Sequence, residues 1–121
     1  MTLRATEVVI DCADHDVITS FWSAALPGWQ RRDVNEQYVA LVPPEAQRAG
    51  EGPRPLPLLF QKVPEGKVVK NRVHLDFRSE DMDAEVERLL GLGAQLLAQR
   101  SLGDFRWSVL ADPEGNEFCV S

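Results

Sequence analysis

The sequence carries the same pattern twice. EVVIDCAD, from Glu7 to Asp14, and HLDFRSED, from His74 to Asp81, each alternate in character and end on an aspartate. A helical stretch and then a glycine follow in both copies. The two starting points lie 67 residues apart (74 − 7), which indicates two fused supersecondary units and not a solenoid. Equivalent positions of such a repeat, here Glu7 and His74, can converge on one pocket.

Alternation and helical spacing predict a β-α-β-β-β order in each half, and therefore an α+β fold. Asp14 and Asp81 are predicted N-caps of the two helices, and Gly93 is predicted to end the second. We expect a first module over about residues 5–66 and a second over about 70–121. The remaining strands are predicted at 29–33, 37–42, 58–63, 94–99, 106–111 and 117–121.

Composition excludes several classes of function. The chain has 13 basic and 19 acidic residues, a net charge of −6, so a nucleic-acid partner is not expected. No apolar run reaches the roughly 18 residues of a membrane span, and the N-terminus does not resemble a signal peptide. Two cysteines predict no disulfide scaffold, so we expect a cytoplasmic protein. The segment PPEAQRAGEGPRPLP, residues 43–57, is predicted to be an irregular loop.

One face of the predicted strands is polar. In the second half Val73, Leu75 and Phe77 form the apolar face of the first strand, and the alternate residues form the other. The polar side chains on that face are Glu7, Asp11, His74, Asp76, Arg78, Glu117, Cys119 and Ser121. Two carboxylates and one imidazole suffice for a divalent metal such as Zn, Ni, Fe, Mn or Co. The alternative is a merely solvated face, which antiparallel sheets commonly have.

Other residues have two interpretations each. His15 is predicted to be a solvated residue beside the helix cap, because Asp14 already explains the turn. Trp107 fits either the core or a ligand cavity wall. The basic residues between the halves fit a solvated connector or an anion-attracting rim. Arg78 could hold a substrate carboxylate or neutralise a nearby acid. Cys119 fits a small buried residue better than a soft metal ligand.

The doubled plan, with DCADHDVITSFWSAALPGW, KVVKNRVHLDF and DPEGNEFCV, resembles the glyoxalase/bleomycin-resistance group, the vicinal oxygen chelate superfamily. The small glyoxalase-like branch is the most similar. The resemblance covers Val8 to Val120. It implies two βαβββ modules that form a cupped mixed sheet around a small-molecule site. It also implies a homodimer.

The resemblance implies site residues by position. A metal, when present, is held by a residue opening the first strand of each half and by acids near the fourth strands. These positions imply metal ligands at Glu7, His74 and Glu117, with Glu117 also the catalytic base. The chain departs at Leu59, which aligns with Glu117 and cannot bind a metal. Gln61, two residues on, offers an amide oxygen to metal or substrate.

The resemblance leaves two functions open. One is a metal-dependent lyase or isomerase acting on a small oxygenated metabolite, with Arg78, Trp107 and Gln61 binding the substrate. The other is a metal-free protein that binds a small molecule or an antibiotic without transforming it. No organic cofactor is expected, because no dinucleotide fingerprint or phosphate loop is present. Glu7, His74 and Glu117 favour the enzyme, whereas Leu59 favours the binder.

Overall fold

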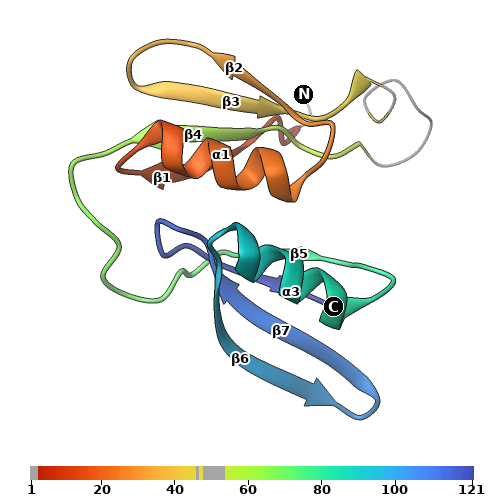
Figure 1. Ribbon diagram of the computed structural model, residues 1–121. Helices are drawn as coiled ribbons and strands as arrows, with labels where there is room; N and C mark the ends of the chain where they lie inside the picture. Colours follow the sequence, from red (N-terminus) through yellow and green to blue (C-terminus); the bar gives the residue numbers. More distant parts are fainter. Residues whose placement is uncertain (1–2, 46, 48–53) are drawn as a thin grey trace. The chain divides into compact units, whose positions relative to one another are not determined.

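The computed structural model describes residues 3–45, 47 and 54–121. The chain divides into two compact units, Met1–Gly66 and Lys67–Ser121, each with one sheet and a helix on it (Figure 1). The α+β class and the two βαβββ modules are therefore confirmed. Of the predicted loop at 43–57, residues 46 and 48–53 lie outside the described residues.

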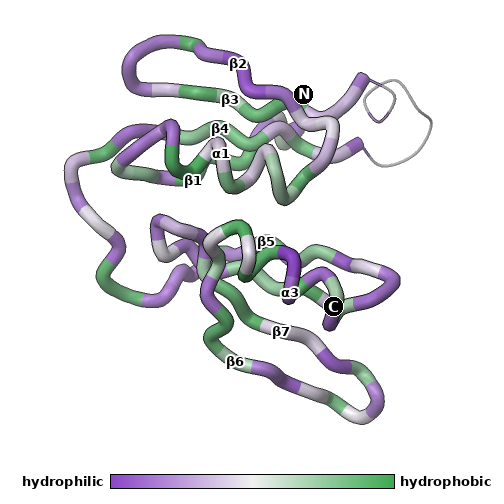
Figure 2. The backbone as a smooth tube through the Cα atoms, viewed as in Figure 1, coloured by the Kyte–Doolittle hydropathy of each residue, from purple (hydrophilic) through white to green (hydrophobic). Residues whose placement is uncertain are grey.

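The first unit is a mixed four-stranded sheet with one helix. Its strand order is β1-β4-β3-β2, with β1 parallel to β4 and the other pairs antiparallel. Helix α1 packs against β2, β3 and β4. Strand β2 is exposed and hydrophilic along its length (Figure 2). The elements are β1 (Val8–Cys12), α1 (His15–Ala25), β2 (Gln30–Asp33), β3 (Tyr38–Val42) and β4 (Leu58–Lys62).

Helix α1 begins where the sequence predicts. The Asp14 side chain accepts hydrogen bonds from the backbone N–H groups of Asp16 and Val17, which satisfies donors that the first turn leaves free. Apolar residues on one side of the helix then enter the core, where the Phe21 and Trp22 rings meet edge to face at 5.1 Å. The buried core of this unit includes Ile18, Phe21, Trp22, Val39, Leu41 and Phe60.

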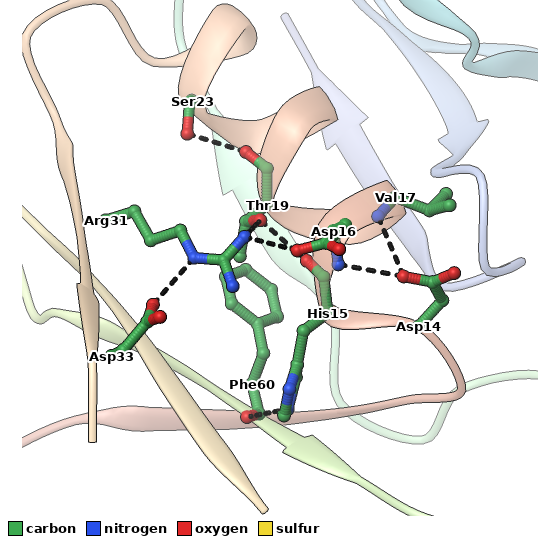
Figure 3. A network of polar contacts seen from close by, with 9 residues as sticks. All are labelled: Asp14, His15, Asp16, Val17, Thr19, Ser23, Arg31, Asp33 and Phe60. Atoms are coloured by element: carbon green, nitrogen blue, oxygen red, sulfur yellow. Dashed lines mark hydrogen bonds and ion pairs between the residues drawn. The ribbon is translucent and has the colours of Figure 1, made fainter. Parts of the chain in front are cut away.

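The expectation that His15 is a solvated residue was wrong. Its Nε2 lies 3.0 Å from the carbonyl oxygen of Gln37 and 3.2 Å from that of Phe60, the contact drawn in Figure 3. Because both oxygens only accept, Nε2 must carry a proton and donate. The imidazole thus ties the first turn of α1 to the sheet. Sequence spacing missed this because both partners are backbone groups 22 and 45 residues away.

A second contact joins α1 to β2. Arg31 donates from Nη1 to Asp16 at 2.7 Å and to the Thr19 hydroxyl at 3.1 Å, and from Nε to Asp33 at 2.8 Å (Figure 3). The guanidinium therefore connects the helix with the outermost strand. The two acids are mostly exposed, so the pairs fix orientation more than they add stability.

The second unit repeats the plan. Its strand order is β5-β8-β7-β6, with β5 parallel to β8 and the other pairs antiparallel. Helix α3 packs against β6, β7 and β8. The elements are β5 (Leu75–Phe77), α3 (Met82–Leu92), β6 (Gln95–Leu102), β7 (Phe105–Ala111) and β8 (Glu117–Val120).

Helix α3 has both predicted ends. Asp81 accepts from the backbone N–H of Ala84, and Gly93 ends the helix in the left-handed conformation at φ +118°, which a residue without Cβ adopts without strain. The buried core of this unit includes Val86 and Leu89 from the helix and Leu110, Phe118 and Val120 from the sheet. Val73 does not join this core as predicted, because β5 begins only at Leu75 and Val73 is 80% exposed.

Among the described residues, no helix has the length and apolar character that crossing a bilayer requires.

Candidate functional site

The side of the second sheet away from α3 carries the candidate site. Strand register places Asp76 beside Cys119, Cys119 beside Val109, and Val109 beside Ala98. This row crosses all four strands, and all four residues line one pocket. We call this side of the sheet the pocket face. The alternate residues on β8, Phe118 and Val120, are buried, so the predicted division of β8 into two faces is confirmed.

His74, Asp76 and Cys119 form a compact cluster on the pocket face. Nδ1 of His74 lies 3.2 Å from an Asp76 carboxylate oxygen and 3.9 Å from Cys119 Sγ. One ligand-type atom from each residue lies within 4.8 Å of the others. A carboxylate can only accept, so without a metal Nδ1 donates to Asp76, and a metal held between the three residues would take the place of that proton. Nitrogen, oxygen and sulfur ligands therefore come together at one point.

The Cys119 thiol is held in its protonated form. Burial, with 7% of the residue exposed, raises the pKa of this thiol because it disfavours the charged form. The Asp76 carboxylate raises the pKa further by its charge and by a hydrogen bond, and only the charge of Lys70 opposes this. Without a metal, Cys119 is therefore a weak nucleophile.

Glu117 is bound by the segment of the second unit that precedes β5. One carboxylate oxygen accepts from Lys67 Nζ at 2.9 Å, and the other accepts from the Asn71 backbone N–H at 2.6 Å. Burial alone would raise the pKa of Glu117, but these hydrogen bonds and the charges of Lys67 and Lys70 outweigh it and lower the pKa. The side chain is only 12% exposed, so the pair is shielded from water. A carboxylate with a lowered pKa is a weak base.

This arrangement predicts a pH-dependent stability. Because the folded-state pKa of Glu117 lies below its ordinary value of 4.5, ionised Glu117 stabilises the fold above that pH, and the stabilisation disappears as pH falls through the folded pKa. We expect Glu117→Gln to lower the free energy of unfolding at about pH 7, with the deficit shrinking towards about pH 3. Urea denaturation of metal-free protein across this range measures it. A deficit that is independent of pH would contradict the assignment.

The pocket extends from the cluster along the β6–β7 hairpin. It has a volume of about 800 Å³, within the range of small-molecule sites. Its polar end is formed by Lys70, His74, Asp76, Glu117 and Cys119. Its other wall is mostly apolar, with Leu97, Ala98, Leu102, Phe105, Trp107 and Val109. Of the two interpretations of Trp107, the structure thus supports the cavity wall.

The first unit has a different face at the equivalent positions. If Glu7 corresponds to His74, then Val9 corresponds to Asp76, and their strand partners Leu59 and Cys119 correspond to each other. This register corrects the alignment of Leu59 with Glu117, which was two residues out. Neither Val9 nor Leu59 has a side chain that can bind a metal. The first unit therefore lacks an equivalent of the cluster at these positions.

The other predicted site residues stay untested. Glu7 is exposed and precedes β1, and Gln61 lies on β4 between Asp11 and Tyr38. Both belong to the first unit. Arg78 is exposed just after β5 and is not among the residues that line the pocket. Glu117 does line the pocket, but its carboxylate contacts Lys67 and Asn71, whereas His74 contacts Asp76 and Cys119.

The sequence pattern alone does not bring this cluster together. It places Asp76 on the correct face without a role, and its prediction that Cys119 is a small buried residue is confirmed, since only 7% of that residue is exposed. The available signal was the alternation: both share a face with His74. What alternation lacks is the register between strands, which brings Cys119 opposite Asp76. Lys67 likewise reaches Glu117 across 50 residues.

Comparisons with known proteins identify the family. A sequence model of the glyoxalase-like domain matches residues 7–121, and no curated protein sequence matches the chain. Three solved structures share the fold. A mutant of the fosfomycin resistance protein FosX from Listeria monocytogenes, complexed with Mn(II) and 1S,2S-dihydroxypropylphosphonic acid, has a TM-score of 0.75 at 14% identity, over 99% of this chain and 90% of its own.

Two further solved structures have similar TM-scores and sequence identities. FosX from Mesorhizobium loti has a TM-score of 0.70 at 14% identity, over 99% of this chain and 92% of its own. A glyoxalase/bleomycin resistance protein/dioxygenase family enzyme from Burkholderia phytofirmans has a TM-score of 0.70 at 19% identity, over 95% and 94%. The duplicated βαβββ fold and the match over almost the whole chain place this protein in the glyoxalase-like domain family of the vicinal oxygen chelate superfamily.

Proposed function

We propose that this protein binds a small oxygenated molecule on the pocket face of its second unit, beside a divalent metal held by His74, Asp76 and Cys119. The observation that carries the proposal is the position of this cluster. Its three ligand atoms lie within 4.8 Å of one another at the polar end of a pocket of about 800 Å³ with an apolar wall. Ligand pockets commonly combine such a wall with a few convergent polar groups.

The donor set fits a metal of intermediate softness. Imidazole and thiolate suit Zn, and also Fe, Ni and Co, better than they suit Mn. Three protein ligands leave coordination positions for water or substrate, as in catalytic zinc sites. A metal bound there would polarise a substrate oxygen, which is what lyase and isomerase reactions require. Metal binding by a related fold, Mn(II) in FosX, supports the proposal without naming the ion here.

The chain's own residues have separate parts in this function. In the metal-free site Asp76 accepts from Nδ1 of His74, which keeps these two of the three side chains that would hold the metal next to each other. Glu117 accepts hydrogen bonds from Lys67 and from the Asn71 N–H. These contacts hold the segment before β5 against β8. The role of Glu117 as a metal ligand or base stays a prediction, as does the role of Glu7.

Metal content tests the proposal. Protein purified without chelator or a nickel column should contain about one divalent ion per chain by elemental analysis. Removing the ion should lower the melting temperature, and restoring Zn(II) to about 100 times its dissociation constant should add about 2.7 kcal/mol of stability. Absence of stoichiometric metal, together with no rise in melting temperature for Zn, Ni, Co, Fe or Mn, would end the metal proposal.

A metal-free binding protein is the second candidate, and one observation favours it. The polar groups at this end of the pocket already have partners, His74 with Asp76 and Glu117 with Lys67, so these side chains do not need an ion to satisfy them. In that case metal-depleted protein should bind its ligand as tightly as untreated protein, and the ligand should be recovered unchanged by mass spectrometry. Turnover that depends on added metal would exclude this candidate.

A further inference from the structure

The charges around the pocket are unequally paired. Of the two acids that line it, Glu117 pairs with Lys67 at 2.9 Å, and Asp76 contacts the His74 imidazole at 3.2 Å. Two cations, Lys70 and Arg100, also line it. Within the part of the chain that the structure describes, neither of them forms an ion pair. The charge of Lys70 acts on Glu117, so Arg100 is the pocket cation that no ion pair among the described residues neutralises.

Arg100 stands beside an aromatic surface. Register pairs Arg100 with Trp107 and Leu102 with Phe105 across the hairpin, and all four residues line the pocket. The Phe105 and Trp107 rings lie 5.7 Å apart and are tilted by only 31°, so they form one continuous surface. Leu102 and Phe105 are well exposed although they are apolar. A flat apolar group could cover this surface and remove it from water.

The opposite face of the hairpin provides a contrast. Arg106, next to Trp107 in sequence, approaches Asp83 at 3.5 Å. The cation on the helix side of the hairpin thus has an acidic neighbour, whereas the cation on the pocket face has none among the described residues. Arg100 and Arg106 carry the same charge, but only Arg106 has an acidic partner among the described residues.

Resting on the proposed function of the same pocket, we propose that its ligands are organic carboxylates with a flat apolar body. The body lies over Phe105 and Trp107, and the carboxylate is held by Arg100. A guanidinium binds a carboxylate through two parallel hydrogen bonds, which adds geometric selectivity to charge attraction. Lys70, at the end of the pocket near Glu117 and Cys119, adds positive potential without contacting the same group.

A matched pair of probes tests the proposal. We suggest 3-phenylpropanoate and its neutral amide, which share the apolar body and differ in charge. Saturation-transfer NMR titration on the full chain, stripped of metal beforehand, gives both dissociation constants and prevents a bound ion from attracting the carboxylate. The carboxylate should bind about fivefold more tightly than the amide, the upper range for an exposed charge pair. Trp107→Ala should weaken both probes.

Variants of the two arginines then show which of them attracts the carboxylate. Arg100→Gln should remove the preference for the carboxylate and leave amide binding unchanged, whereas Arg106→Gln should keep the preference. Equal binding of the two probes to the unaltered protein, or a preference that survives Arg100→Gln, overturns the proposal while leaving the pocket intact. If neither probe binds, this proposal fails, whereas the metal and ligand measurements on untreated protein still test the proposed function separately.

Discussion

Cys119→Ala is expected to weaken Zn(II) binding on the order of 100-fold or more. Loss of residues that merely orient metal ligands already costs about 10- to 100-fold, and here one of three direct ligands would disappear. The sulfur is the softest donor of the cluster and sets its preference for Zn over Mn. His74→Ala should have an effect of the same order. Competition with a chromophoric chelator measures the affinity.

The chain supplies a matched control for this experiment. Cys12, the other cysteine, is also buried and forms no disulfide, but it lies on β1 in the first unit. Cys12→Ala removes a thiol with the same chemistry and should leave zinc affinity unchanged. If Cys12→Ala and Cys119→Ala behave alike, the cluster is not the metal site. Asp76→Asn should give a smaller loss, because its amide oxygen can still serve as a neutral oxygen ligand.

The largest loss of stability in the second unit is expected for Leu110→Ala. Leu110 is 0% exposed on β7, between Leu96 and Phe118 on the neighbouring strands. Removing its buried methyl groups costs transfer free energy and leaves a cavity, together about 2–5 kcal/mol. Most domains have only about 5–15 kcal/mol of stability. We therefore expect a large decrease in the urea midpoint, followed by far-UV circular dichroism.

The control for this change lies at the tip of the same hairpin. Leu102 is 77% exposed on β6, so Leu102→Ala should change the free energy of unfolding by no more than about 0.5 kcal/mol. It should nevertheless weaken binding of an apolar ligand, because Leu102 lines the pocket. Equal destabilisation by Leu102→Ala and Leu110→Ala would mean that the two faces of this sheet have been assigned wrongly.

Local features of the chain were predictable because their causes are local. Asp14 and Asp81 cap helices through backbone groups two or three residues away, and Gly93 ends a helix because of its own missing side chain. Alternation in β8 correctly separated buried Phe118 and Val120 from Glu117 and Cys119 on the pocket face. The duplicated order of elements follows from these signals and from the family resemblance.

Two kinds of detail could not be obtained in this way. The predicted start of a strand was wrong where the alternating pattern extends beyond the hydrogen-bonded segment. Val73, for example, precedes β5 and is exposed to solvent. Hydrogen bonds to distant backbone groups were not predicted either, such as those between His15 and its two carbonyl partners. In both cases the sequence pattern is compatible with more than one set of long-range neighbours.

The sequence by itself determined the fold, the helix ends and the face on which His74 and Glu117 lie. Only the tertiary structure decided which side chains meet on that face. In the structure Cys119 lies beside Asp76 and close to His74, whereas Glu117 is hydrogen-bonded to Lys67 and Asn71. The physical reason is that periodicity fixes the direction of a side chain along its own strand, whereas neighbours across a sheet depend on register, which hydrogen bonding between distant segments sets.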